Sequence, residues 1–272
     1  MDKIDTSGLT KAQATLLMPL WSRAVESRND QPLVRDNKAQ EIVGRLDFDF
    51  NTFQKRSVPA LDYNLRASVI DQLSTEFLSA NEQSTVVEIG VGLDTRLERL
   101  DDGRTVWVEL DLPDAMAMRK RFFDPDRRRV MISGSLLDEG WLDQIDQHRN
   151  GPILFIAEGV FYFFDESQIR NLLSRLVDRF PGSSLIFDAQ SPFFLFVSNI
   201  RHPLQDSRLR FSLGKVGRIE SWDPRLTVQK YVGFGDAPYY DAGMHRVSPL
   251  RRWGRRLIPP VRHLFKIVQV GW

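Results

Sequence analysis

The spacing of hydrophobic residues changes character near residue 85. Before it, apolar residues recur three or four positions apart, which predicts helices after Thr10, over 37–46 and over 61–77. After it, short continuous apolar runs are separated by stretches long enough for helices, as strands of a parallel sheet buried on both faces require. The expected strands are 86–89, 106–110, 130–132, 153–156, 185–187 and 265–270. This alternation predicts a doubly wound α/β fold.

We expect one domain with four regions. A helical cap covers 1–80, a core 84–190, a lid 191–264 and a final strand 265–272. The core contains the clearest helix, over 166–179, which Pro181 and Gly182 end. The lid is assigned because aromatic, proline, glycine and arginine residues mix there without a clear period.

The first expected strand leads into a turn with Gly90 and Gly92, at the edge where open α/β sheets bind ligands. Asp111 ends the next strand, 21 residues after Gly90, where an acid accepts hydrogen bonds from a ribose. A dinucleotide fingerprint needs a third glycine where this chain has Thr95, so a nicotinamide cofactor is disfavoured. A cofactor with a ribose and no phosphate fits better, although such a turn can also be purely structural.

Composition narrows the class of protein. The 37 basic and 36 acidic residues give a net charge of +1, which argues against a nucleic-acid partner. Cysteine is absent, and the four histidines lack metal-ligand spacing, so we expect no metal. No apolar run approaches the ~18 residues of a membrane span. The first residues are also unlike a signal peptide, and we therefore expect a cytoplasmic protein without a membrane partner.

Three ordered motifs carry a family resemblance. They are V-E-I-G-V-G-L-D-T-R (87–96), E-L-D-L-P (109–113) and A-E-G-V-F-Y (157–162). Together they resemble the leucine carboxyl methyltransferase family, and within it a bacterial branch of polyketide O-methyltransferases, whose first helix is similar to residues 12–24. The resemblance implies a class I methyltransferase-like, Rossmann-like fold and S-adenosyl-L-methionine as cofactor.

The resemblance also implies roles for single residues. Arg66 would pair with the methionine carboxylate, Asp111 would hold the ribose, and Glu158 would lie at the amino or methyl end. Where the family often has an acid near the adenine, this chain has Ser135, which weakens that assignment. The complete set of expected cofactor residues is Arg66, Glu88, Gly90, Gly92, Asp94, Asp111, Leu112, Ser135, Leu136 and Glu158.

The need for a catalytic base depends on the acceptor. A carboxylic acid is already ionised near neutral pH, whereas a phenol, with a pKa of ~10, benefits from a base. The candidate catalytic residues are His202, His245 and Tyr162. An aromatic cluster could wall an apolar acceptor pocket, although such residues also build cores; its members are Phe161, Tyr162, Phe163, Phe164, Phe193, Phe194 and Phe196.

The charge is unevenly distributed along the chain. Residues 242–272 carry a charge of +7 and the rest −6, which favours an anionic acceptor. Within this tail, Arg251 and Arg255, like Arg252 and Arg256, would share a helix face. The leading hypothesis is an enzyme that methylates a carboxylate of a small aromatic or polyketide-like metabolite. A phenolic O-methyltransferase, a non-catalytic cofactor-binding protein and, last, a nicotinamide oxidoreductase are the alternatives.

Overall fold

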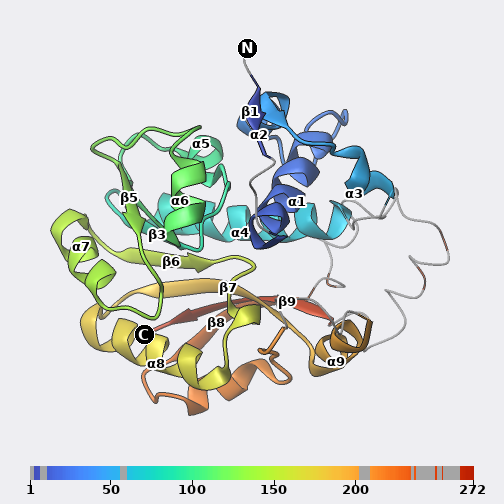
Figure 1. Ribbon diagram of the computed structural model, residues 1–272. Coiled ribbons are helices and arrows are strands. Elements are labelled where there is room, and N and C mark those ends of the chain that lie inside the picture. Colours follow the sequence, from blue (N-terminus) through green and yellow to red (C-terminus); the bar gives the residue numbers. More distant parts are fainter. Residues whose placement is uncertain are drawn as a thin grey trace.

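A seven-stranded sheet forms the centre of this computed structural model, which describes residues 3–6, 11–55, 60–201, 209–233, 236, 249, 253 and 264–272 (Figure 1). In their order across the sheet, the strands are β5 (Arg129–Ser133), β4 (Val106–Asp111), β3 (Thr85–Ile89), β6 (Ile153–Ala157), β7 (Ser184–Gln190), β9 (Phe265–Gly271) and β8 (Thr227–Gly233). Neighbours from β5 to β7 are parallel, and β9 is antiparallel to β7 and β8. All six strands expected from sequence are confirmed, as is the α/β class.

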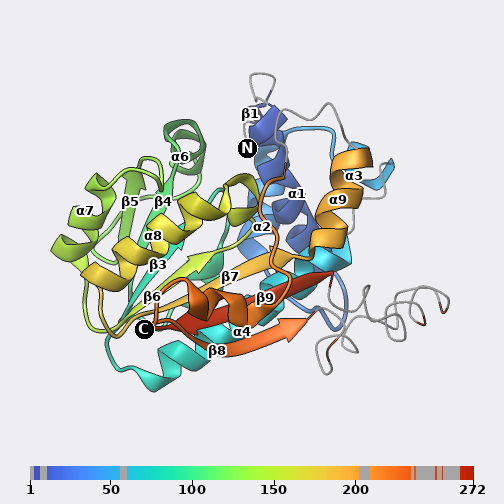
Figure 2. The ribbon, with the colours of Figure 1, turned by 90° about the horizontal axis from the view of Figure 1, so that it is seen from below.

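Helices cover both faces of the sheet (Figure 2). The covering helices are α4 (Ala60–Ala80) and α5 (Arg96–Leu100) on one face, and α7 (Gly140–His148) and α8 (Glu166–Arg179) on the other. Side chains alternate along a strand, so Val86 packs under α4 while Val87 packs toward α7 and α8. Among the described residues, no helix is both long and apolar enough to cross a membrane.

Three N-terminal helices form a cap beside the sheet (Figure 1). They are α1 (Lys11–Glu26), α2 (Asn37–Arg45) and α3 (Asn51–Lys55), with a small parallel ladder of β1 (Ile4–Asp5) and β2 (Leu46–Asp47) that the sequence did not predict. The apolar core of the cap includes Leu20 and Trp21, and it continues to Phe122 and Phe123, which follow α6 (Pro113–Arg119). The cap thus packs on the sheet side that carries the loop after β3.

Asp36 fastens the cap to that loop. Its buried Oδ1 accepts a hydrogen bond from Ala39 N at 2.8 Å as the N-cap of α2. Its Oδ2 accepts from Arg23 Nε at 2.8 Å, from Thr95 Oγ1 at 2.5 Å and from Arg99 Nη1 at 3.3 Å. One carboxylate therefore joins two cap helices to the residues that follow β3.

The region expected as a lid contributes regular structure. It contains α9 (Pro192–Arg201), the 3-10 helix η2 (Val216–Ser221) and β8. β8 is an edge strand whose side chains are mostly exposed, so it lacks the continuous apolar run that marks the other strands. The expectation that 191–264 is a lid without a strand of the sheet is therefore corrected at β8, which is an edge strand of the sheet. Another 3-10 helix, η1 (Phe161–Phe163), follows β6.

Candidate active site

The order of the strands reverses at β3. The chain continues to β4 and β5 on one side of β3 and to β6 and β7 on the other. In open parallel sheets this switch point leaves a crevice at the carboxyl ends of the strands, where ligands bind. The segments that meet at this edge are 90–95, 111–112, 158–162 and 188–190.

The turn after β3 requires its two glycines. Gly90 has φ +67° and Gly92 has φ +50°, in the left-handed region that favours glycine. A Cβ atom on Gly90 would lie 2.5 Å from Val160 Cγ2, and one on Gly92 would lie 3.0 Å from Leu16 Cδ2. The turn thus packs closely between the segment after β6 and α1 of the cap. A ligand can approach its backbone closely because positions 90 and 92 carry no side chains.

We expect Gly90→Ala to lower the free energy of unfolding by about 3 kcal/mol, because it adds the contact with Val160 to backbone strain. Gly103→Ala is the matched control. Gly103 has φ +75° with nothing within 4 Å of its added Cβ, so backbone strain alone should cost about 1 kcal/mol. Urea denaturation of both variants measures the difference, and equal losses would disprove the close packing on Val160.

Asp111 is held rigidly at the end of β4. Its Oδ2 accepts a hydrogen bond from Gly92 N at 2.6 Å, and its Oδ1 accepts from Leu112 N at 2.7 Å. Burial raises the pKa of Asp111, and these two N–H groups partly oppose the rise. Each oxygen keeps a second lone pair that can accept a hydrogen bond from a hydroxyl. Asp111 therefore has the geometry of a fixed acceptor beside the glycine turn.

Arg66 reaches from α4 to the ends of β6 and β7. Its Nε donates to Glu158 Oε1 at 2.8 Å and its Nη1 to Asp188 Oδ2 at 2.9 Å. Burial alone would lower the pKa of Arg66, but Asp188 and Glu158 raise it above its ordinary value. Its Nη2 has no hydrogen-bond partner among the described residues. Two carboxylates therefore fix the guanidinium, and no residue that the structure describes occupies its third nitrogen, which can bind another anion.

Asp188 was not predicted from the sequence. It lies in β7 with 1% of its side chain exposed, and it accepts hydrogen bonds from Gly159 N at 2.6 Å and Tyr162 Oη at 2.5 Å. Burial, together with Asp188, raises the pKa of Tyr162 well above its ordinary value. Tyr162 is therefore protonated, and its hydroxyl donates a hydrogen bond to Asp188, which also binds Arg66.

Four carboxylates lie on the face of the sheet covered by α4, in two neighbouring levels. Glu88 is level with Glu109, while Glu158 and Asp188 come two residues further along their strands. We call Glu109, Glu88, Glu158 and Asp188 the carboxylate row. Each comes two positions after an apolar residue of that face, and these residues are Trp107, Val86, Ile156 and Ile186. Arg119 pairs with Glu109, Arg96 with Glu88 and Glu158, and Arg66 with Glu158 and Asp188. The acids after apolar runs are visible in the sequence, but their proximity appears only when the strands pair.

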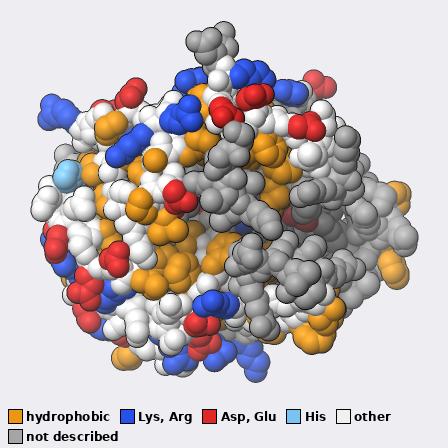
Figure 3. Space-filling model, in the orientation of Figure 1, with side chains coloured by type: hydrophobic (Ala, Val, Ile, Leu, Met, Phe, Trp, Pro, Cys, Tyr) orange, Lys and Arg blue, Asp and Glu red, His pale blue; other side chains and the backbone are white. Residues whose placement is uncertain are grey.

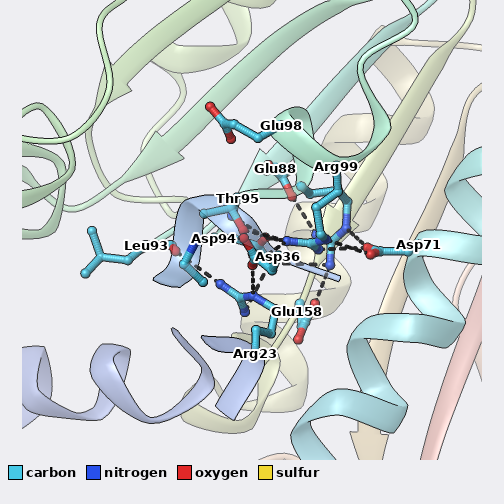
Figure 4. A network of polar contacts seen from close by, with 12 residues as sticks. Arg23, Asp36, Asp71, Glu88, Leu93, Asp94, Thr95, Glu98, Arg99 and Glu158 are labelled. Carbon is cyan, nitrogen blue, oxygen red and sulfur yellow. Dashed lines mark hydrogen bonds and ion pairs between the residues drawn. The ribbon is translucent and has the colours of Figure 1, made fainter. Parts of the chain in front are cut away.

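Glu88 and Asp94 both face arginines (Figure 4). Glu88 Oε1 accepts from Arg96 Nη1 at 2.5 Å, while its buried Oε2 has no partner in the described structure. Burial raises the pKa of Glu88 to about 7, against the effect of Arg96. Burial also raises that of Asp94, but Arg96, Arg23 and Arg99 bring the pKa of Asp94 well below its usual value. Both carboxylates are thus part of a buried ionic network beside the turn.

The other predicted residues are less informative. Ser135 follows β5, where its Oγ accepts a hydrogen bond from Leu137 N at 3.1 Å, and Leu136 is buried in the core. His202 and His245, both candidate bases, lie outside the described residues, as do the arginines Arg251, Arg252, Arg255 and Arg256. The described residues contain no group of histidine and acidic side chains that could hold a metal ion.

The charges of the site fit S-adenosylmethionine, whose carboxylate, ammonium and sulfonium sum to +1. Six carboxylates and four guanidinium groups form the network at this edge: Asp36, Asp71, Glu88, Asp94, Glu158 and Asp188, with Arg23, Arg66, Arg96 and Arg99. The excess of negative charge suits a cationic ligand. Nη2 of Arg66, which has no partner in the described part of the chain, suits its carboxylate, and the glycine turn with Asp111 suits its adenosine.

Exposed apolar side chains lie around the same edge. Leu112 follows β4, Phe163 follows β6, and Phe193 and Phe196 lie on α9, with 40–65% of each exposed. Figure 3 shows hydrophobic side chains gathered near the centre of the face seen in Figure 1. Phe161, in contrast, is fully buried in the core, so the expected aromatic wall does not form as one unit.

Comparisons with known proteins give the family of the chain. The model of the leucine carboxyl methyltransferase family matches residues 16–177. The tetracenomycin polyketide synthesis O-methyltransferase TcmP of Streptomyces glaucescens is 29% identical, over 97% of this chain and 98% of the relative. The S-adenosyl-L-methionine-dependent methyltransferase dpfgK of Gibberella zeae is 25% identical over 75% of each chain.

Solved structures show the same fold. A DUF574 family protein from Streptomyces avermitilis superposes with a TM-score of 0.60 at 11% identity, covering 94% of this chain and 96% of that one. A SAM-dependent methyltransferase from Anabaena variabilis gives a TM-score of 0.51 at 12% identity, covering 76% of this chain and 84% of that one. The predicted Rossmann-like methyltransferase fold is thereby confirmed.

Proposed function

Because the chain belongs to the leucine carboxyl methyltransferase family, it is an S-adenosylmethionine-dependent methyltransferase, and we propose that it methylates a carboxylate oxygen of a small, anionic, aromatic acceptor. The observation that carries the cofactor site is the fixed Arg66, whose Nη2 has no partner in the described structure. The acceptor class is supported by the family and by the exposed apolar side chains around the site.

We assign the cofactor contacts as follows. Arg66 binds the carboxylate of the methionine portion, Asp111 accepts hydrogen bonds from ribose hydroxyls, and the backbone of Gly90 and Gly92 lies along the cofactor. Asp94 and the other carboxylates of the network supply negative potential toward the cationic groups, and Glu88, whose pKa burial raises to about 7, adds to it in its ionised form. When bound, S-adenosylmethionine supplies an electrophilic methyl group on a positively charged sulfur.

The protein then has to align the acceptor and exclude water, because the transfer is an in-line displacement. A carboxylate acceptor is ionised near neutral pH and needs no base. Tyr162 is poorly suited to act as one, since its hydroxyl donates to Asp188 and its pKa is raised. We assign Tyr162 the positioning of Asp188. A base such as His202 or His245 is required only if the acceptor is a phenol.

The nature of the acceptor rests on three observations. The relative from Streptomyces glaucescens is named for tetracenomycin polyketide synthesis, which favours a polyketide-like acceptor here. Phe163, Phe193 and Phe196 offer apolar contact surface. The charge of +7 over residues 242–272, against −6 for the rest, favours an acceptor with negative charge.

Methyl transfer from labelled S-adenosylmethionine into a metabolite extract tests this function. A carboxylate acceptor gives a methyl ester, so mild alkali should release the label as methanol. Label that survives alkali as an aryl ether would establish phenolic O-methylation instead. A purified aromatic acid that accepts the label can then be compared with its uncharged primary amide, which should not react.

A further inference from the structure

Arg96 has no part in the function derived so far, although it closes the G-L-D-T-R motif and is almost completely buried. It is the first residue of α5, and its guanidinium reaches three elements. Nε donates to Asp71 on α4 at 2.8 Å, Nη1 to Glu88 on β3, and Nη2 to Glu158 after β6, the last two at 2.5 Å. Anchors on α4 and β3 fix this guanidinium firmly.

Glu158 is shared between Arg96 and Arg66. Its Oε2 accepts from Arg96 Nη2, and its Oε1 accepts from Arg66 Nε at 2.8 Å. A carboxylate bound by one arginine alone can turn to form a two-pronged pair with it. Arg96 holds Oε2 on its own side, so in this arrangement Glu158 presents Oε1 alone to Arg66. Figure 4 shows Glu158, Glu88 and Asp71 around this part of the network.

Asp188 fixes the other side of Arg66. Its Oδ2 accepts from Arg66 Nη1 at 2.9 Å, so the guanidinium is gripped at Nε and Nη1 by two different carboxylates. If Glu158 turned toward Arg66, it would compete for Nη2, for which the described residues provide no partner. Arg96 thereby determines which nitrogen of Arg66 stays available.

We propose that Arg96 is a positioning residue, which holds Glu158 so that Arg66 presents its Nη2 to the carboxylate of the cofactor. The proposal rests on the proposed assignment of Arg66 to that carboxylate. It deepens this assignment by giving the motif arginine a task at a distance from the ligand. Arg96 should therefore affect the binding of the cofactor carboxylate and not that of the adenosine, because Arg66 contacts the carboxylate alone.

The test compares two ligands by isothermal titration. They are S-adenosylhomocysteine and its decarboxylated analogue, which keeps the amino group and the adenosine. Arg96→Lys keeps the positive charge but cannot span three carboxylates, so it separates positioning from charge. We expect it to weaken S-adenosylhomocysteine about tenfold and the analogue less than about threefold. Arg129→Lys is the matched control, since Arg129 pairs with Glu109 and Glu98 away from Glu158.

Glu158→Gln tests the same link from the other side and provides a second variant should Arg96→Lys fold poorly. If Arg96 acts through Glu158, the double variant should lose little more carboxylate selectivity than either single variant. Equal weakening of both ligands, or additive losses, would overturn the proposal while leaving the cofactor assignment intact. Failure of the wild-type protein to prefer S-adenosylhomocysteine over the analogue would instead contradict the assignment of Arg66.

Discussion

Replacing Arg66 with glutamine is expected to lower the affinity for S-adenosylhomocysteine by about thirtyfold or more, since truncating one partner of a buried charge pair costs about 2–5 kcal/mol. Glutamine removes the cation that would face the ligand carboxylate. It also takes two hydrogen bonds from Glu158 and Asp188. Those acids keep other partners, Arg96 for Glu158 and Tyr162 for Asp188, so the chain should still fold. Isothermal titration of the purified variant measures the loss.

The control for Arg66 is Arg129→Gln, which removes an arginine from the same sheet face at the Glu109 end of the carboxylate row. We expect its affinity for S-adenosylhomocysteine to stay within about threefold of the wild type, because any effect there reaches the site only through neighbours. If Arg66→Gln bound as tightly as this control, Arg66 would have no contact with the ligand.

Asp36→Ala is expected to lower the free energy of unfolding by about 4 kcal/mol, through loss of a helix cap and of a buried ion pair. Asp36 is the acceptor for Arg23, Ala39, Thr95 and Arg99, and none of its side chain is exposed. Alanine removes a carboxylate partner from Arg23 and from Arg99. It also removes the hydrogen bond that joins the cap to Thr95, after β3. Urea denaturation followed by circular dichroism measures the change.

Asp165→Ala is the matched control for Asp36. Asp165 caps α8 in a capping box with Gln168, and it is exposed, so its loss should cost about 1 kcal/mol. Asp36→Asn is intermediate, because the amide oxygen can still cap α2 without a charge. A loss for Asp36→Ala no greater than for Asp165→Ala would mean that the link between cap and turn contributes nothing.

The core of the fold could be predicted because its signals are local. Each buried parallel strand is a continuous apolar run, and α8 lies at 166–179 as its apolar spacing and the following Pro181 predicted. β8 was missed for a physical reason. An edge strand is half solvated, so its sequence carries no apolar run, and its existence depends on pairing with β9 about forty residues away.

The candidate site divides in the same way. The glycine turn and Asp111 are tied to strand ends, and the sequence predicts where strands end. The ion pairs are non-local, since Arg66 contacts Glu158 and Asp188 from 92 and 122 residues away. The sequence shows arginines and acids but not which pair, so Asp188 and the task of Arg96 emerged only when β6 and β7 lay side by side.

The central claim is that Arg66, held by the carboxylate row, binds the carboxylate of the cofactor. A thermodynamic cycle tests it most directly: wild type and Arg66→Gln are each titrated with S-adenosylhomocysteine and with its decarboxylated analogue. The account predicts that the wild type binds S-adenosylhomocysteine at least about tenfold more tightly than the analogue, and that Arg66→Gln loses this preference. Equal binding of the two ligands by the wild type, or an unchanged preference in Arg66→Gln, would contradict it.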